Sequence, residues 1–128
     1  MPKGPLVAIV DDDGSIRDTT KDLLESAGFS AAVFARPASL LKSSRLSEVR
    51  CLITDVRMPK MTGLELHQQL IGANRTIPTI LMTAYPDERS RAQAIKANVV
   101  GYLIKPFAAH DLLACVRRAL RRCDVAGE

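Results

Sequence analysis

Four aspartates stand at the ends of two apolar runs in this sequence. Asp11, Asp12 and Asp13 directly follow one short run, and Asp55 follows another that is rich in β-branched residues. Carboxylates held about 4 Å apart repel by roughly 4 kcal/mol per pair at an effective dielectric constant near 20. Such a cluster must raise its pKa values or hold a cation. Hard carboxylate oxygens without His or Cys at metal spacing favour magnesium, so the sequence predicts a Mg²⁺ site.

Two further polar residues, Thr83 and Lys105, end apolar runs later in the chain. Magnesium is commonly held by few carboxylates together with water and phosphate oxygens. The Lys105 ammonium and the Thr83 hydroxyl could both contact phosphoryl oxygens. A carboxylate such as Asp55 could itself be the nucleophile and form an aspartyl phosphate. The residue types therefore favour phosphoryl chemistry.

Strands that alternate with helices must position these side chains. Strands are predicted over residues 6–10, 29–34, 51–55, 77–82 and 99–104. Helices are predicted over residues 14–27, from 37 to about 46, and over 63–71, 87–97 and 109–122. This alternation indicates an α/β fold with a parallel sheet whose two faces are covered by helices. Ligands of such open sheets bind beyond the carboxyl ends of the strands, where the polar residues are predicted to converge.

The composition is typical of one globular domain spanning residues 1–128, with 47% hydrophobic and 25% charged residues. No apolar run approaches the roughly 20 residues that a membrane span needs, and the N-terminus does not resemble a secretory signal. Cys51, Cys115 and Cys123 form no spaced framework. Reduced thiols, and hence a cytoplasmic location, are the expectation.

The formal net charge of +4 raises the question of nucleic-acid binding. Much of the positive charge lies near the C-terminal end, on Arg117, Arg118, Arg121 and Arg122. No aromatic residues interleave with these arginines and no recognition motif accompanies them. The sequence therefore predicts an exposed helix face rather than direct nucleic-acid binding.

Asp13 and three other polar residues are expected to have ordinary structural roles. Asp13 is expected to cap the first helix or face solvent, because acids are favoured at helix N-termini. His67 and His110 are predicted to be exposed on their helices. Asn98 stands where a residue in the left-handed conformation would end the helix over 87–97, and Asn tolerates that conformation.

Four motifs in this order resemble a response-regulator receiver domain of two-component signalling. They are Val10-Asp11-Asp12-Asp13, then Asp55-Val56-Arg57-Met58-Pro59 leading to Gly63, then Thr83-Ala84 and Lys105-Pro106-Phe107. The sequence of residues 55–59 and 63–66 most resembles that of the receivers of FixJ-like transcriptional regulators. The resemblance covers about residues 6–122 and implies a flavodoxin-like, doubly wound sheet of five parallel strands, in the order 2-1-3-4-5, with five helices.

The resemblance also implies roles for individual residues. Asp55 would accept a phosphoryl group from the phosphohistidine of a sensor histidine kinase. Mg²⁺ would be bound by Asp11, Asp12 and Asp55 and by the backbone carbonyl of Val56. Lys105 would pair with Asp55 and later with the phosphate. Such a domain is a signalling receiver that catalyses only its own phosphorylation and dephosphorylation.

Further implications concern the signal. Thr83 and Tyr102 would act as the switch residues, Arg57 and Tyr85 occupy positions that tune phosphoryl lifetime, and Pro106 would follow a cis peptide bond. The face formed by the fourth helix, fifth strand and fifth helix would meet a partner or a second copy. The regulated output would be transcription.

Two other readings fit parts of the pattern. A magnesium-dependent phosphatase of the haloacid dehalogenase type would use Asp11 as nucleophile, with Asp13, Thr83 and Lys105 in supporting roles. It needs a further late acidic pair, however, and it leaves Asp55 without a role. A flavin-binding domain of similar topology is disfavoured because no phosphate-cradling loop or aromatic pair is evident.

Overall fold

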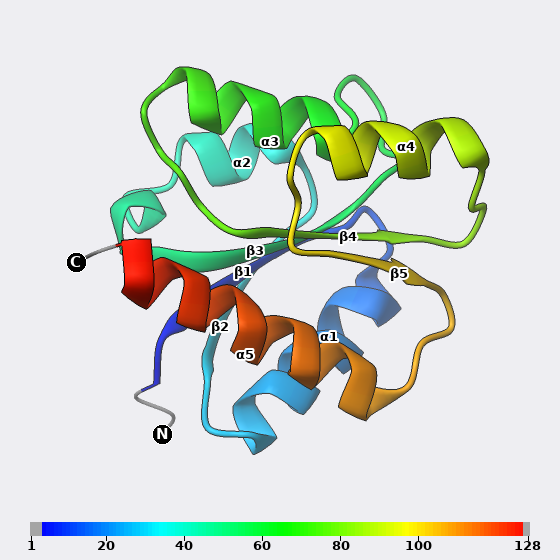
Figure 1. Cartoon of the computed structure of the whole chain (residues 1–128). Coiled ribbons are helices and arrows are strands. Elements are labelled where there is room, and N and C mark those ends of the chain that lie inside the picture. Colours follow the sequence, from blue (N-terminus) through cyan, green and yellow to red (C-terminus); the bar gives the residue numbers. More distant parts are fainter. Residues whose placement is uncertain (1–3, 127–128) are drawn as a thin grey trace.

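Five parallel strands form one sheet in the order β2-β1-β3-β4-β5 (Figure 1). The computed structural model describes residues 4–126, and the side chains among them up to residue 121. The strands are β1 (Leu6–Val10), β2 (Ser30–Phe34), β3 (Val49–Asp55), β4 (Thr79–Thr83) and β5 (Gly101–Ile104). The helices are α1 (Gly14–Ser26), α2 (Pro37–Leu41), α3 (Gly63–Gly72), α4 (Glu88–Lys96) and α5 (Ala109–Ala126), with a short 3-10 turn η1 (Leu46–Glu48) before β3. The predicted flavodoxin-like fold and strand order are confirmed.

Helices cover both faces of the sheet, as the uninterrupted apolar strands predicted. Helices α2, α3 and α4 lie on one side, and α1 and α5 lie on the other (Figure 1). One hydrophobic core joins α1 and α5 to the sheet and includes Ile9, Ile53 and Leu112. The second core lies under α2 and α3 and includes Leu52 and Leu66. Strand β2 is added on one side of β1, and β3, β4 and β5 are added on the other side. The carboxyl ends of β1 and β3 therefore flank the switch point of the topology.

Several predicted boundaries differ from the structure by a few residues. Strand β3 begins at Val49 rather than Cys51, and β4 and β5 each begin two residues later than predicted. The second helix ends at Leu41, and Leu46 belongs to the 3-10 turn. Helix α5 continues to Ala126, beyond the predicted end at 122. The ends of helices and strands have weak local signals, but the predicted carboxyl ends of β1, β3 and β5 agree with the structure, and β4 ends at Thr83, one residue after its predicted end.

Caps hold the helices at the residues that the sequence indicated. Asp13 is the N-cap of α1, where its side chain accepts a hydrogen bond from the Ser15 amide. Gly28 and Asn98 both have left-handed backbone conformations, with φ of 96° and 63°. The predicted capping roles of Asp13 and Asn98 are therefore confirmed.

The arginine-rich end of α5 is exposed where its side chains are described, at Arg117, Arg118 and Arg121. The side chains of Arg122 and Cys123 lie outside the described residues. Cys51 and Cys115 are buried. No helix within residues 4–126 has the length and apolar character needed to cross a membrane.

His67 is buried, and the prediction that it is exposed was wrong. Its exposed fraction is 6%. Its Nδ1 lies 2.8 Å from the Thr79 hydroxyl, and its Nε2 lies 3.2 Å from the Ala97 carbonyl oxygen. Gly63, Leu66, His67 and Leu70 are the buried residues of α3 and have the spacing of one helical face. His67 therefore links α3 to β4 and to the end of α4. His110, by contrast, is exposed as predicted.

Burial of His67 predicts a loss of stability at mildly acidic pH. Burial lowers the pKa of His67, and the hydrogen bond to Ala97 offsets this only in part. The unfolded chain takes up a proton near pH 6.5 that the folded chain resists, so stability is complete above that pH and falls as pH decreases below it. Urea unfolding from pH 7 to 5 should show this extra slope, at most roughly 1.4 kcal/mol per pH unit. It should disappear in His67→Gln and persist in His110→Gln; equal slopes in all three proteins would contradict the expectation.

Candidate functional site

Two carboxylates from neighbouring strands lie side by side at the switch point. Asp11 directly follows β1 and Asp55 is the last residue of β3. The register pairs Val10 with Thr54, so the next residue of each strand is an aspartate. Asp11 is 0% exposed and Asp55 is 9% exposed. The sheet thus holds two acidic groups close together where little water can screen them.

Asp12 completes a group of three carboxylates. One oxygen from each of Asp11, Asp12 and Asp55 lies within 4.8 Å of the others. Asp12 is exposed and so opens the group to solvent. Asp13 is directed elsewhere: its carboxylate accepts hydrogen bonds from the Ser15 hydroxyl and amide, which lower its pKa. Asp13 therefore serves as the cap of α1 and is not one of the three grouped carboxylates.

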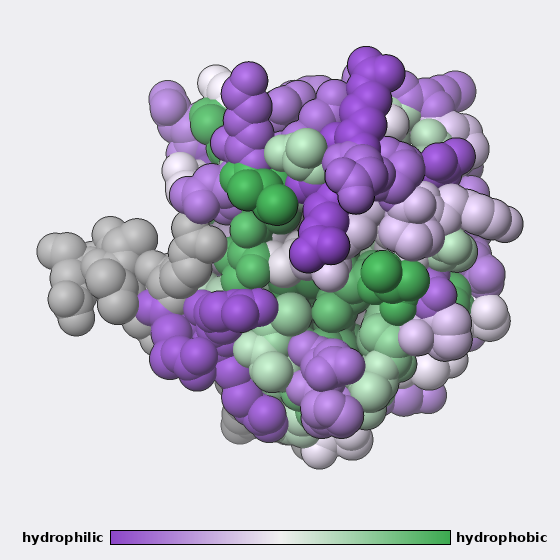
Figure 2. Space-filling view, turned by 45° about the vertical axis from the view of Figure 1, so that its right-hand side comes forward, coloured by the Kyte–Doolittle hydropathy of each residue, from purple (hydrophilic) through white to green (hydrophobic). Residues whose placement is uncertain are grey.

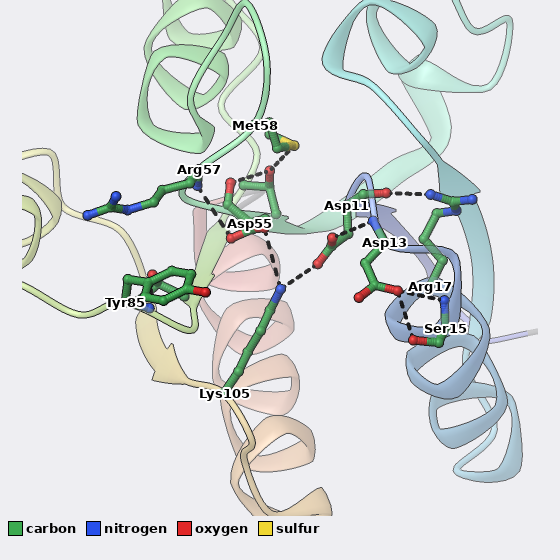
Figure 3. A network of polar contacts seen from close by, with 11 residues as sticks. Asp11, Asp13, Ser15, Arg17, Asp55, Arg57, Met58, Tyr85 and Lys105 are labelled. Atoms are coloured by element: carbon green, nitrogen blue, oxygen red, sulfur yellow. Dashed lines mark hydrogen bonds and ion pairs between the residues drawn. The ribbon is translucent and has the colours of Figure 1, made fainter.

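Lys105 inserts its ammonium between the two buried carboxylates (Figure 3). Its Nζ lies 2.8 Å from Asp11 Oδ2 and 3.4 Å from Asp55 Oδ2. The resemblance implied a pair with Asp55, and the structure shows a shorter contact with Asp11. Burial by itself would lower the pKa of Lys105, but the hydrogen bond and charge of Asp11, with the charge of Asp55, raise it overall. Lys105 is therefore a fixed positive charge in this site.

The ionised form of Asp55 remains unfavourable despite the nearby Lys105, and its pKa is raised. Burial is the main cause that raises its pKa, and the neighbouring Asp11 adds to it. Lys105 and the Arg57 amide, which lies 3.4 Å from Asp55 Oδ1, oppose the shift without cancelling it. A divalent cation would relieve this cost by adding positive charge on the open side of the site.

The residues present fit Mg²⁺. The three carboxylates supply hard oxygen ligands, and few protein ligands leave room for water and phosphate oxygens. The Val56 carbonyl accepts a hydrogen bond from the Gly63 amide at 3.1 Å. A carbonyl oxygen has a second lone pair, so this bond leaves Val56 able to serve as a further ligand.

The other predicted residues surround this centre. Thr83 ends β4, is 1% exposed, and accepts a hydrogen bond at 3.0 Å from the Tyr85 amide. The Lys105–Pro106 peptide bond is cis, as the resemblance implied. Tyr102 lies on β5, the strand next to β4, and its hydroxyl is 2.7 Å from the Ser90 hydroxyl of α4.

Three neighbours of the site were missed by sequence reasoning. Arg17 donates a hydrogen bond to the Asp11 backbone oxygen at 2.7 Å. Asp87 pairs with Arg57, and Ser90 contacts Tyr102. Only Asp87 had a local signal, since an aspartate before a helix is a favoured N-cap. The partners of Arg17 and Ser90 depend on side-chain directions that the spacing does not determine.

Comparisons with known proteins agree with this arrangement. Residues 7–117 match the family model of the response regulator receiver domain. The chain is 34% identical over 119 residues to the response regulator protein TodT of Pseudomonas putida, which aligns 93% of this chain with 52% of TodT. It is 34% identical over 127 residues to the transcriptional regulatory protein FixJ of Azorhizobium caulinodans, which aligns 99% of this chain with 60% of FixJ. The chain therefore spans between half and two thirds of the length of these relatives.

Solved structures of similar proteins have the same fold. The crystal structure of FixJ-N superposes with a TM-score of 0.82 at 30% identity and covers 93% of this chain and 95% of that one. The response regulator StyR superposes with a TM-score of 0.88 at 36% identity and covers 96% of this chain and 62% of that one. The family match spans most of the sequence and includes both strand ends that carry the acidic site. This chain therefore belongs to the response regulator receiver domain family.

Proposed function

We propose that this chain is a single receiver domain, residues 1–128, that accepts a phosphoryl group on Asp55 from the phosphohistidine of a sensor histidine kinase. The observation that carries the proposal is the position of the Lys105 ammonium, 2.8 Å from Asp11 and 3.4 Å from Asp55, beside a group of three carboxylates. Asp55 would react as the nucleophile, and the positive charge of Lys105 would offset part of the negative charge of the carboxylates.

Mg²⁺ is the cofactor that this donor set favours. Asp11, Asp12, Asp55 and the Val56 carbonyl would hold it. When bound, Mg²⁺ supplies positive charge to the oxygens of the transferring phosphoryl group. The raised pKa of Asp55 reflects a carboxylate that lacks enough compensating charge, which supports binding of a cation here.

The transfer step uses Asp55 as the nucleophile. A carboxylate oxygen of Asp55 forms a new bond to phosphorus in line with the breaking P–N bond, whose electron pair remains on the kinase imidazole. Lys105 contacts the transferring phosphoryl oxygens, and the Thr83 hydroxyl donates a hydrogen bond to one of them. Water later attacks phosphorus, the P–O bond to Asp55 breaks with its electron pair left on the Asp55 carboxylate, and inorganic phosphate is released, which resets the protein.

The signal would be read on the face formed by α4, β5 and α5, with Thr83 and Tyr102 as switch residues. Ile95 and Ile104 are 71% and 52% exposed on this face. Figure 2 shows apolar side chains gathered between polar ones on the side of the molecule that carries α4 and β5. Such a surface suits a second copy of this chain or a protein partner. FixJ and other relatives are transcriptional regulators, so transcription is the output we propose.

Replacement of Asp55 by asparagine should abolish phosphorylation and stabilise the protein. Acetyl phosphate with Mg²⁺ should add one phosphoryl group per wild-type chain, measured by intact mass, and none to Asp55→Asn. Because the folded pKa of Asp55 is raised, its ionisation costs stability as pH rises through that pKa. Asp55→Asn should therefore unfold at higher urea than wild type at pH 7, with the difference closing in acid.

The alternative hypothesis of a phosphatase predicts the opposite labelling results. Such an enzyme would hydrolyse the donor with many turnovers, and Asp11→Asn rather than Asp55→Asn would stop it. Stoichiometric labelling that survives in Asp55→Asn would also contradict the proposal. Glu48→Gln, a change of an exposed acid before β3, serves as the matched control and should label like wild type.

A further inference from the structure

The first turn of α4 contacts the loop that follows Asp55. Asp87, the N-cap of α4, accepts a hydrogen bond from the Ser90 amide at 2.7 Å through Oδ1. Its other oxygen, Oδ2, lies 3.5 Å from Arg57 Nη2. The Arg57 guanidinium also lies over the Tyr85 ring, 5.6 Å from its centroid. One carboxylate therefore both caps α4 and holds an arginine that stands two residues after Asp55.

The same helical turn contacts β5 through Ser90. The Ser90 Oγ lies 2.7 Å from the Tyr102 hydroxyl and 3.3 Å from the Asp87 carbonyl oxygen. A carbonyl oxygen can only accept, so the Ser90 hydroxyl donates to Asp87 and the Tyr102 hydroxyl donates to Ser90. The resulting chain of contacts runs from Arg57 through Asp87 and Ser90 to Tyr102.

We propose that Asp87 and Ser90 are positioning residues that together form a latch: it holds Tyr102 against α4 in the unphosphorylated protein and opens when Asp55 is phosphorylated. The inference rests on the proposed function, because it assigns the regulation of the same site. It goes further in naming the residues that keep the switch in its resting position.

Phosphorylation would withdraw Arg57 from Asp87. A phosphoryl group carries about −1.5 to −2 charge, more than the single charge of Asp87. The Arg57 amide lies 3.4 Å from Asp55 Oδ1, so the Arg57 side chain extends from a backbone position beside the phosphorylation site. Arg57 and Asp87 have side chains that are 62% and 44% exposed, and ion pairs that exposed are weak. The Asp87 end of the latch is therefore easily released.

A change at Thr83 would also affect the loop between β4 and α4. Its hydroxyl now accepts a hydrogen bond from the Tyr85 amide, in the loop that leads directly to Asp87. If the Thr83 hydroxyl turns to donate to a phosphoryl oxygen, the Tyr85 amide loses this partner and the loop can shift. The start of α4 would then move relative to β5 and break the contact between Ser90 and Tyr102.

Removal of the Ser90 hydroxyl tests the latch. The chain has only two tyrosines, so fluorotyrosine labelling gives two ¹⁹F NMR resonances, which Tyr85→Phe assigns. In Ser90→Ala without donor, the Tyr102 resonance should move toward its position in phosphorylated wild type. The rate of labelling by acetyl phosphate should increase about fivefold, the factor that one intramolecular hydrogen bond contributes to the population of the competent state.

Two variants separate a latch from a general effect on folding. Ser90→Thr keeps a hydroxyl and should restore both the resonance and the rate, and Gln93→Ala, an exposed change on the same helix, should alter neither. An unmoved Tyr102 resonance in Ser90→Ala, or an unchanged rate, overturns the latch while wild type still labels. Failure of wild type to take up a phosphoryl group would overturn the proposed function, and the latch with it.

Discussion

Gly63→Ala is expected to destabilise the protein by about 3 kcal/mol, since overpacking against fixed backbone is among the costlier core changes. Gly63 is the buried first residue of α3, and an added Cβ would collide with the Asp55 backbone oxygen and lie 3.0 Å from Thr54 Cγ2. Backbone cannot rotate away as a flexible side chain can. Either α3 or the end of β3 must shift, so labelling of Asp55 should fall together with stability. Urea unfolding and acetyl phosphate labelling measure the two effects.

The same helix provides the matched control. Gly72 is the last residue of α3, and an added Cβ there meets nothing within 4 Å. Gly72→Ala should leave labelling unchanged and raise stability by up to about 1 kcal/mol, because alanine favours the helix. Equal effects of the two substitutions would show that close packing of α3 on Asp55 is not what requires glycine at position 63.

Lys105→Met is expected to cost about 3 kcal/mol at pH 7 in the absence of divalent cations. The substitution leaves Asp11 and Asp55 facing each other without the ammonium that contacts both. Removal of one partner from a buried ion pair exposes the full desolvation cost of the charge that remains. Addition of Mg²⁺ should recover part of the lost stability, because the cation replaces the missing positive charge. Labelling of Asp55 should be slowed severely even with Mg²⁺ present.

A lysine outside the site controls for the loss of charge. Lys96 is exposed in the last turn of α4, and Lys96→Met should change stability by no more than about 0.5 kcal/mol. It should also show no dependence on Mg²⁺. A Lys105→Met protein as stable as Lys96→Met would mean that the carboxylates at this edge do not need the lysine.

The centre of the site could be predicted because it depends on strand ends. Asp11 and Asp55 each follow an apolar run, and parallel strands bring their carboxyl ends to one edge, so their proximity follows from the topology. The prediction that these two residues converge, with Asp12 and Lys105 beside them, agrees with the distances in the structure.

The contacts around the centre could not be predicted in the same way. His67 was expected to be exposed, and it contacts Thr79 and Ala97, which are 12 and 30 residues away in the chain. Ser90 was not singled out, because its contact with Tyr102 depends on how α4 packs beside β5. Periodicity identifies which face of an element is buried, and it does not identify which polar group on another element a side chain will meet.

Mapping the phosphorylated residue is the most direct test of the central claim. An aspartyl phosphate is an acyl phosphate, so borohydride reduces it to homoserine, which peptide mass spectrometry can locate. After treatment with acetyl phosphate and Mg²⁺, homoserine should be found at position 55 alone and should be absent when Mg²⁺ is omitted. Homoserine at position 11, or a phosphoryl group that forms on Asp55 equally well without Mg²⁺, would contradict the account.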